Sequence, residues 1–526
     1  MIPLGHRLKQ GQKDDRPSER NVEQKTRCCG SPATSNGAGG IRIHAMSRRA
    51  GLRRVMRREP DYTVLGKITT PDGSVVPDVP CRVYLPRNAM GRPYLEFDLT
   101  EDQTGSLAAL EFSVEGHADI SNGVLSIRSD IVLASGWSAE HRGSKFIKCT
   151  MPGEPWDLEI SSGSESDDSV IQNGTFWLSP NRLLNPRLIS RFSYTGVVEM
   201  KTARELVFQL PAGLVHFRTH FHHEDKKSAV LRTSELVAEL NQNLERAKLG
   251  NFVKELDDVL LLTSLATRHR CVCRGWRIGT ANCETLFYRN RLAVPKARKI
   301  GRQETLIDDP EFDDFLKHAF SRFRQNDGRE AMRQAIDLLV SSQEGTIEAS
   351  FLKCFAALET LVTLYRQSAG LGTILDPQSW ATFENDFKSF IKGHALFKED
   401  SDRRKLVYEK RAELNRVAFG TVYRKCTESL GKHGFHDDDL WPVVGSSRGL
   451  SLAEIRNRIV HGEVFTPPQQ EALFKALIHL RWGVERMVLA FLEWPLERSL
   501  VGRFLGRMAT YRTWKDAQEL LSRVPT

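Results

Sequence analysis

The chain has 526 residues, 40% of them hydrophobic and 27% charged, which is a globular composition over a length that usually needs two or three domains. It contains no run of 18 apolar residues and no apolar secretory segment, so neither a membrane span nor export is indicated and a cytoplasmic location is expected. The formal charge of +9 comes from the first 60 residues, which hold 14 Lys/Arg and 5 Asp/Glu. The remainder is balanced, so any affinity for nucleic acid must come from local patches rather than from a global field.

Residues 1–58 are basic, rich in Gly and Ser, and without apolar periodicity, which predicts a disordered tail. A start at Met46 or Met56 would remove most or all of this segment, so it is a candidate mis-assigned start. A competing interpretation takes Ser47–Arg58 as an Arg-rich anchor for RNA or for an acidic surface.

Residues 59–300 show the alternation and turn signals of an antiparallel, sandwich-like or barrel-like β domain. The clearest strand, Tyr62–Thr69, alternates in hydrophobicity and runs into the turn residues Pro71, Asp72 and Gly73. Two or three further strands are expected between Leu188 and Phe221. The other strands are predicted at 81–85, 94–99, 107–114, 123–133, 145–151 and 176–178.

A helical hairpin is expected to interrupt this β domain. Ser228–Ala247 and Phe252–Thr267 both carry apolar residues at helical spacing. Strands at Cys271–Ile278 and Thr285–Val294 then return the chain to the sheet, and the basic segment Pro295–Arg302 is interpreted as a linker. The fold class is therefore multidomain α+β.

Residues 305–526 change character and are predicted to form an all-α bundle. Apolar residues recur with a period near 3.6 almost to the end of the chain. The helices are predicted at 309–325, 329–341, 346–367, 378–392, 402–430, 452–461 and 468–492.

The stretch from Ser451 to Gly462 carries the candidate chemistry. Ser451 and Glu454 have capping-box spacing and Gly462 suits a helix end, so a short, well-delimited helix is expected. An apolar stripe and a polar face lie on its opposite sides. The stripe contains Leu452, Ile455 and Ile459, and the polar face contains Glu454, Asn457, Arg458 and His461.

A histidine on such a face can act on RNA without a metal or other cofactor. The 2′-hydroxyl is a nucleophile next to its own phosphodiester, and a neutral imidazole such as that of His461 can take its proton or deliver one to the leaving 5′-oxygen. Arg456 would hold the phosphate and offset the charge that develops on its oxygens. The expected product is a 2′,3′-cyclic phosphate.

The sequence contains two other histidine-containing patterns. Arg218 and His223 have similar spacing but lie in a predicted strand, where residues five apart face opposite sides, so this second match is interpreted as accidental. The neighbouring His-rich run is interpreted as a polar strand face. His269, Cys271, Cys273 and Cys283 offer zinc-compatible ligand types, yet CxC spacing on a strand favours small buried residues, and no metal site is assigned.

Arg456-Asn457-Arg458-Ile459-Val460-His461 resembles the Arg-x(4–6)-His signature of HEPN domains (higher eukaryotes and prokaryotes nucleotide-binding). Upstream, Ile347–Leu361 is similar to the long core helix of such domains, and Pro468–Leu492 to the closing helix. A β-rich N-terminal domain joined to this unit resembles the ApeA-like anti-phage family.

The resemblance implies an endoribonuclease of anti-phage defence by abortive infection, with its site built across a homodimer. His461 would be the acid/base, Arg456 would bind phosphate, and Asn457 would orient one of them. RNA, including tRNA as a candidate class, would be the substrate. The N-terminal domain would meet an unknown phage trigger or regulator. Because Arg456 points closer to the apolar stripe than His461 does, its length or a partner subunit must bring it to the site.

Supporting roles are less specific. Glu359 borders an apolar helix face and either orients Arg456 or His461 or is a solvated edge residue. Glu454 and Arg458 are secondary candidates beside the motif. A basic helix that includes Arg403, Arg404, Lys410 and Arg411 either follows an RNA backbone or forms an ordinary salt-bridged face. The rival functions are a catalytically silent nucleotide- or RNA-binding HEPN module, which retention of both Arg456 and His461 disfavours, and an interaction scaffold.

Overall fold

The computed structural model places Pro60–Thr526 in one compact unit. The predicted tail 1–58 and the predicted linker 295–302 lie outside the residues that the structure describes. The described ranges are 59–86, 91–107, 110–121, 123–142, 145–163, 170–185, 188–192, 198–202, 206–226, 229–240, 242–292, 305–445, 449–503 and 513–522.

The first part of the β region is a closed barrel. Its strands follow one another in the order β5-β4-β1-β2-β3-β7, and a direct pairing of β7 with β5 closes the ring. Alternate residues of β1 are buried, as the sequence predicted, so its inner side chains join a core that fills the barrel. The elements here are β1 (Tyr62–Thr69), β2 (Val75–Tyr84), β3 (Tyr94–Leu99), α2 (Glu101–Ser106), β4 (Glu111–Ile120), β5 (Gly123–Ala134), β6 (Ser138–Arg142) and β7 (Lys145–Pro155).

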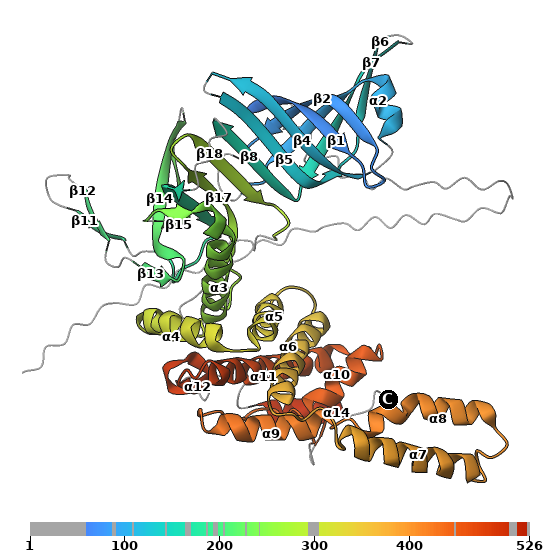
Figure 1. Cartoon of the computed structure of the whole chain (residues 1–526). Coiled ribbons are helices and arrows are strands. Elements are labelled where there is room, and N and C mark those ends of the chain that lie inside the picture. Colours follow the sequence, from blue (N-terminus) through green and yellow to red (C-terminus); the bar gives the residue numbers. More distant parts are fainter. Residues whose placement is uncertain are drawn as a thin grey trace, which may run out of the picture. The chain divides into compact units, whose positions relative to one another are not determined.

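From β5 the same sheet continues outward in the order β8-β18-β17-β10-β15-β14-β13, all antiparallel (Figure 1). These strands are β8 (Asp157–Gly163), β10 (Asn173–Leu178), β13 (Leu206–Leu210), β14 (Gly213–Lys226), β15 (Ala229–Leu240), β17 (Cys273–Gly279) and β18 (Cys283–Arg289). Two small ladders pair β11 (Leu188–Phe192) with β12 (Val198–Thr202) and β9 (Val170–Ile171) with β16 (Leu244–Glu245). The β-rich character of this region is thus confirmed.

The predicted helix at Ser228–Ala247 is wrong, because this segment is mainly strand β15, followed by β16 and a short 3-10 turn. Its Leu, Ala and Glu residues favour helix locally, but β15 pairs with β14 on one side and β10 on the other, and this tertiary pairing overrides the local preference. The second predicted helix is confirmed as α3 (Leu249–Thr267). A single helix therefore replaces the predicted hairpin.

The described residues between 305 and 522 are mainly helical, as predicted, but one predicted helix is divided in two and the short helices α12 and α14 were not predicted. The predicted 402–430 helix is α8 (Ser401–Leu414) and α9 (Phe419–Gly431), separated where the Asn415 amide accepts from the Leu375 N–H (2.7 Å) and donates to its carbonyl (3.2 Å). The other helices are α4 (Phe312–Gln325), α5 (Arg329–Ser341), α6 (Ile347–Ser368), α7 (Pro377–Gly393), α10 (Leu452–Val460), α11 (Pro467–Phe491), α12 (Leu500–Arg503) and α14 (Trp514–Ser522).

A second, larger hydrophobic core joins the outer strands, α3 and the helical bundle. Buried ion pairs accompany it. Arg268, at the end of α3, pairs with Glu485 of α11, and the fully buried Asp258 of α3 pairs with both Arg329 and Arg333 of α5. Helix α10, which carries the motif, is therefore packed through Leu452 and Ile455 in the same core as α3. Among the described helices, none combines the length and the low charge that crossing a membrane requires.

Candidate functional site

Helix α10 begins as the sequence predicted. The Ser451 hydroxyl accepts from the Glu454 N–H (3.3 Å), and the Glu454 carboxylate accepts from the Ser451 N–H (2.7 Å), which is a reciprocal capping box. The Ser451 hydroxyl also lies 2.7 Å from the same carboxylate oxygen, so the Glu454 carboxylate is engaged by Ser451 at the helix start. Its role in the structure is to fix where α10 begins.

The C-terminal end of α10 presents His461 to solvent. Gly462 adopts a left-handed conformation (φ +78°), the Gly462 N–H donates to the Ile459 carbonyl (3.0 Å), and the Glu463 N–H donates to the Arg458 carbonyl (3.1 Å). This is the Schellman arrangement, and it confirms the helix stop predicted at Gly462. His461 is the C-cap residue, and its side chain is exposed.

The structure brings Arg456, Asn457 and Glu359 together. The Arg456 guanidinium donates to the Asn457 Oδ1 (3.2 Å) and lies 3.8 Å from a carboxylate oxygen of Glu359 on α6. Both charged side chains are partly exposed, at 35% and 42%. Glu359 thus stands where it can orient Arg456, which is the first of the two roles considered for it.

Arg456 and His461 are not in contact through any hydrogen bond or ion pair among the described residues. Asn457 and His461 are four residues apart and both exposed, so they share one side at the end of α10. Arg456 leans toward α6 instead. One chain therefore presents an imidazole and a guanidinium on neighbouring but separate parts of the helix surface.

The contacts of Arg458 stabilise the fold around the end of α10. It pairs with Glu463, donates to the Leu521 carbonyl at the end of α14 (2.6 Å) and lies over the Phe465 ring. Partial burial lowers the pKa of this guanidinium from its usual value. Arg458 therefore ties the end of α10 to the following loop and to α14, and each of its three side-chain nitrogens already donates one hydrogen bond.

The basic residues of α8 are mostly engaged within the hairpin that α8 forms with α7. Arg403 pairs with Asp400 (3.1 Å), Arg411 pairs with Glu384 (3.1 Å), and Arg404 donates to two carbonyls of the connecting loop (both 2.6 Å). Lys410 is exposed. This arrangement favours the salt-bridged interpretation over an RNA-tracking face.

The three cysteines that were considered as zinc ligands, Cys271, Cys273 and Cys283, each contact a different neighbour. Cys271 contacts the Ser179 carbonyl (3.8 Å), Cys273 contacts the Gly275 carbonyl (3.4 Å), and Cys283 lies 4.0 Å from the Thr285 hydroxyl. Burial raises the pKa of both Cys271 and Cys273 to about 12, so both remain protonated thiols at neutral pH. They pack as small buried residues, as the sequence indicated.

The His-rich run lies on β14, as predicted for a strand. Val215 and Phe217 are buried, whereas Arg218 and His220 alternate with them and both contact Glu239 of β15 (2.8 Å each). Because Arg218 and His223 belong to the same strand, their sequence spacing has no helical meaning.

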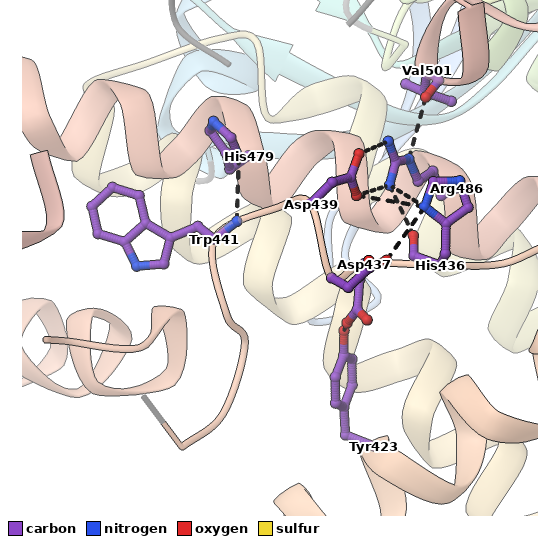
Figure 2. Close-up of polar contacts among 9 residues, drawn as sticks. Tyr423, His436, Asp437, Asp439, Trp441, His479, Arg486 and Val501 are labelled. Carbon is purple, nitrogen blue, oxygen red and sulfur yellow. Dashed lines mark hydrogen bonds and ion pairs between the residues drawn. The ribbon is translucent and has the colours of Figure 1, made fainter. Parts of the chain in front are cut away.

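A polar cluster that the sequence analysis did not single out lies around Arg486 of α11 (Figure 2). This side chain is only 2% exposed. Its guanidinium donates to both carboxylate oxygens of Asp439 (2.5 and 2.8 Å), to the His436 carbonyl (2.8 Å) and to the Val501 carbonyl (3.2 Å). The run His436-Asp437-Asp438-Asp439 is the sequence signal that could have drawn attention to it.

This cluster also groups possible metal ligands, because donor atoms of His436, Asp438 and Asp439 lie within 4.8 Å of one another. However, Arg486 already neutralises Asp439 and contacts the His436 Nδ1 (3.3 Å). A guanidinium in this place opposes a second cation, so we assign the cluster a structural role.

Asp439→Ala is expected to lower the free energy of unfolding by about 3 kcal/mol, because it leaves the buried Arg486 without its carboxylate. Chemical denaturation of the full chain measures this change. Asp438→Ala is the matched control, since the neighbouring side chain is 90% exposed and its loss should leave stability unchanged within about 0.5 kcal/mol. Equal effects of the two substitutions would contradict the structural role of the Arg486 pair.

Comparisons of the chain with protein-family models, with curated proteins and with solved structures gave no match. The function is therefore inferred from the motif, from its geometry and from the resemblance that the motif carries.

Proposed function

We propose that the helical region is a metal-independent endoribonuclease of the HEPN type. The observation that supports this most directly is the end of α10, where the Arg-x(4)-His motif presents an exposed imidazole and, on a neighbouring part of the helix surface, a guanidinium that contacts Asn457 and Glu359. In this proposal His461 moves the proton and Arg456 stabilises charge on the phosphate. Asn457 keeps Arg456 in place by accepting one of its N–H groups.

The nature of the products tests the reaction itself. Incubating RNA with the full chain in excess EDTA should give fragments that end in a 2′,3′-cyclic phosphate, because the attacking group is the 2′-hydroxyl and no metal is required. Mass spectrometry of the fragments identifies the termini. Fragments with 3′-hydroxyl ends, or cleavage that EDTA stops and a divalent cation restores, would contradict the proposal.

The site is proposed to act as a homodimer. Val460 and Val464, which flank His461 in the chain, are 52% and 84% exposed, and Phe474 on α11 is 46% exposed. Exposed apolar side chains next to a polar motif are typical of surfaces that a partner covers. A second copy there would bring another imidazole and another guanidinium to the same cleft.

A silent RNA-binding module is the alternative function. The separation of Arg456 from His461 within one chain favours it if the chain stays monomeric, because binding needs no complete catalytic set. Retained RNA binding without any cleavage, in wild-type protein as well as in variants, would support this alternative.

The resemblance to ApeA-like proteins supports a role in anti-phage defence by abortive infection, with RNA such as tRNA as substrate. In this proposal the β-rich region senses a phage trigger or regulator and acts on the bundle through the shared core. Growth arrest and RNA cleavage that appear only on infection would be the expected cellular result. Equal phage yield with and without the protein would contradict it.

Glu359→Gln is expected to lower the rate of RNA cleavage by no more than about fivefold. The Glu359–Arg456 pair is partly exposed, and such pairs contribute roughly 0.2–1 kcal/mol, which corresponds to about a 1.4- to 5-fold effect. Single-turnover cleavage measures the rate, and Glu348→Gln, at the start of the same helix, is the control. A loss as large as that of Arg456→Ala would give Glu359 a direct part in the chemistry.

A further inference from the structure

The hairpin of α7 and α8 has almost no core of its own. Ile391 is the one buried residue of α7, and α8 has none. Figure 1 shows the two helices as a hairpin that projects from the other helices of the bundle. Helices of 17 and 14 residues are marginally stable in water unless an apolar face is packed.

Polar contacts nevertheless hold the hairpin in a defined shape. The Tyr408 hydroxyl donates to the Lys388 carbonyl (3.2 Å), and Arg411 pairs with Glu384 (3.1 Å). At its base, Asn415 exchanges two hydrogen bonds with Leu375. The hairpin is therefore a preformed surface rather than a loose segment.

Large apolar side chains remain exposed on this preformed surface. Phe383 and Phe390 are 43% and 62% exposed, and they lie seven residues apart, which is two helical turns along one side of α7. Phe383 belongs to a ladder of rings that includes Trp380 (5.4 Å between centroids) and Phe387 (6.1 Å). Further exposed apolar residues of the same segment are Ile374, Leu396, Leu406 and Leu414. Such a concentration marks a binding surface.

The charge of the hairpin favours a like partner over a nucleic acid. Residues 374–416 hold nine Lys/Arg and eight Asp/Glu, so their net charge is close to zero. A surface with this balance has no general attraction for a phosphate backbone. Mixed charges around an apolar centre can instead pair with an identical surface across a two-fold axis.

We propose that the α7–α8 hairpin packs against the same hairpin of a second copy of this chain, forming an intermolecular four-helix bundle that buries Phe383 and Phe390. The proposal deepens the proposed function, because it rests on the second copy that the shared nuclease site requires. Each hairpin contributes two of the four helices, and the apolar residues that one chain leaves exposed become the core.

The area of the hairpin surface is large enough to form a substantial part of a stable dimer interface. Seventeen residues span about 26 Å, and two helices side by side are about 20 Å wide, which gives roughly 500 Å² per copy. A standard interface buries about 800 Å² per partner. The hairpin would thus provide more than half, and the exposed Val460 and Val464 beside the motif offer a second region for the remainder.

The test uses the full-length chain carrying Phe383→Gln and Phe390→Gln together, with Thr382→Ala and Ser389→Ala together as the control. The control residues are also seven apart and exposed, and their hydroxyls bond within α7 (Thr382 to Gln378, Ser389 to Asn385). Glutamine favours helix at least as well as phenylalanine, so the hairpin should stay helical. Sedimentation equilibrium should show a dimer dissociation constant raised at least tenfold in the glutamine variant and unchanged in the control.

A wild-type chain that is monomeric at all concentrations, or a glutamine variant that dimerises like wild type, would overturn the proposal. Hydrogen exchange supplies a second readout, because amides of residues 374–414 should become more protected as the chain is concentrated. Protection that does not change with concentration, or that appears only when RNA is added to monomer, would also overturn it. All of these measurements are made on chains that also carry His461→Ala, and RNA is present only in the hydrogen-exchange comparison that tests its effect, so the outcome is independent of whether the chain cleaves RNA.

Discussion

His461→Ala is expected to reduce RNA cleavage by at least a hundredfold and to leave the fold unchanged. General acid–base catalysis by a positioned side chain contributes roughly 10²–10⁴-fold, and the proposed reaction assigns this role to the His461 imidazole. The side chain is exposed at the end of α10, and the helix end is closed by backbone bonds at Gly462 that alanine keeps. Stability should therefore change by less than about 0.5 kcal/mol.

The measurement is single-turnover cleavage of labelled RNA in EDTA, with thermal unfolding as the check on the fold. His433→Ala is the matched control, because this histidine also follows a helix, α9, and is partly exposed but lies outside the motif. Full activity in a folded His461→Ala protein would refute the catalytic assignment. Loss of activity in both variants would point to a general effect of the substitutions on the protein.

The sequence could predict elements whose local pattern agrees with their packing. Strand β1 is found at the predicted Tyr62–Thr69, and α5 at the predicted Arg329–Ser341, because alternation or helical periodicity coincides there with burial. Helix α10 was predicted with both ends because each end is specified locally, by Ser451 with Glu454 and by Gly462.

The elements that were predicted wrongly depend on contacts between residues that are distant in the sequence. Strand β15 contains good helix formers, and its strand form depends on β14 and β10, which a local pattern does not reveal. The break between α8 and α9 depends on Asn415, which bonds to Leu375 forty residues earlier. Helix α14 was missed because it is a short helix at the end of the chain.

The candidate site shows the same division. The exposure of His461 and Asn457 follows from their place on a short amphipathic helix, so it could be predicted. The contact between Arg456 and Glu359 joins α10 to α6, which lie about a hundred residues apart in the chain. For this reason the sequence alone could not decide between the two roles considered for Glu359. The Arg486 cluster joins α11 to the run after α9, and its members have no shared local pattern.

Mixing His461→Ala subunits with Arg456→Ala subunits is expected to restore part of the cleavage activity that each variant lacks alone. Within one chain Arg456 leans toward Glu359 and has no hydrogen bond or ion pair with His461 among the described residues. One copy therefore does not bring the guanidinium and the imidazole together on one phosphodiester. Cleavage needs a base, an acid and stabilisation of charge on the phosphate. In the proposed homodimer, two copies about a two-fold axis would place both histidines and both arginines near one cleft, and a heterodimer would keep one intact residue of each kind.

The experiment incubates the two variants together until subunits have exchanged, and then measures cleavage in EDTA. The control mixes His461→Ala with a chain that carries both His461→Ala and Arg456→Ala, because this pair contains no intact histidine and must stay inactive. If each subunit held a self-sufficient site, no mixture of the two single variants could recover activity, since every subunit lacks one of its own two groups. Recovery in the first mixture alone would therefore mean that Arg456 of one copy works with His461 of the other, whereas full-rate cleavage by a monomeric wild-type chain would refute the shared site.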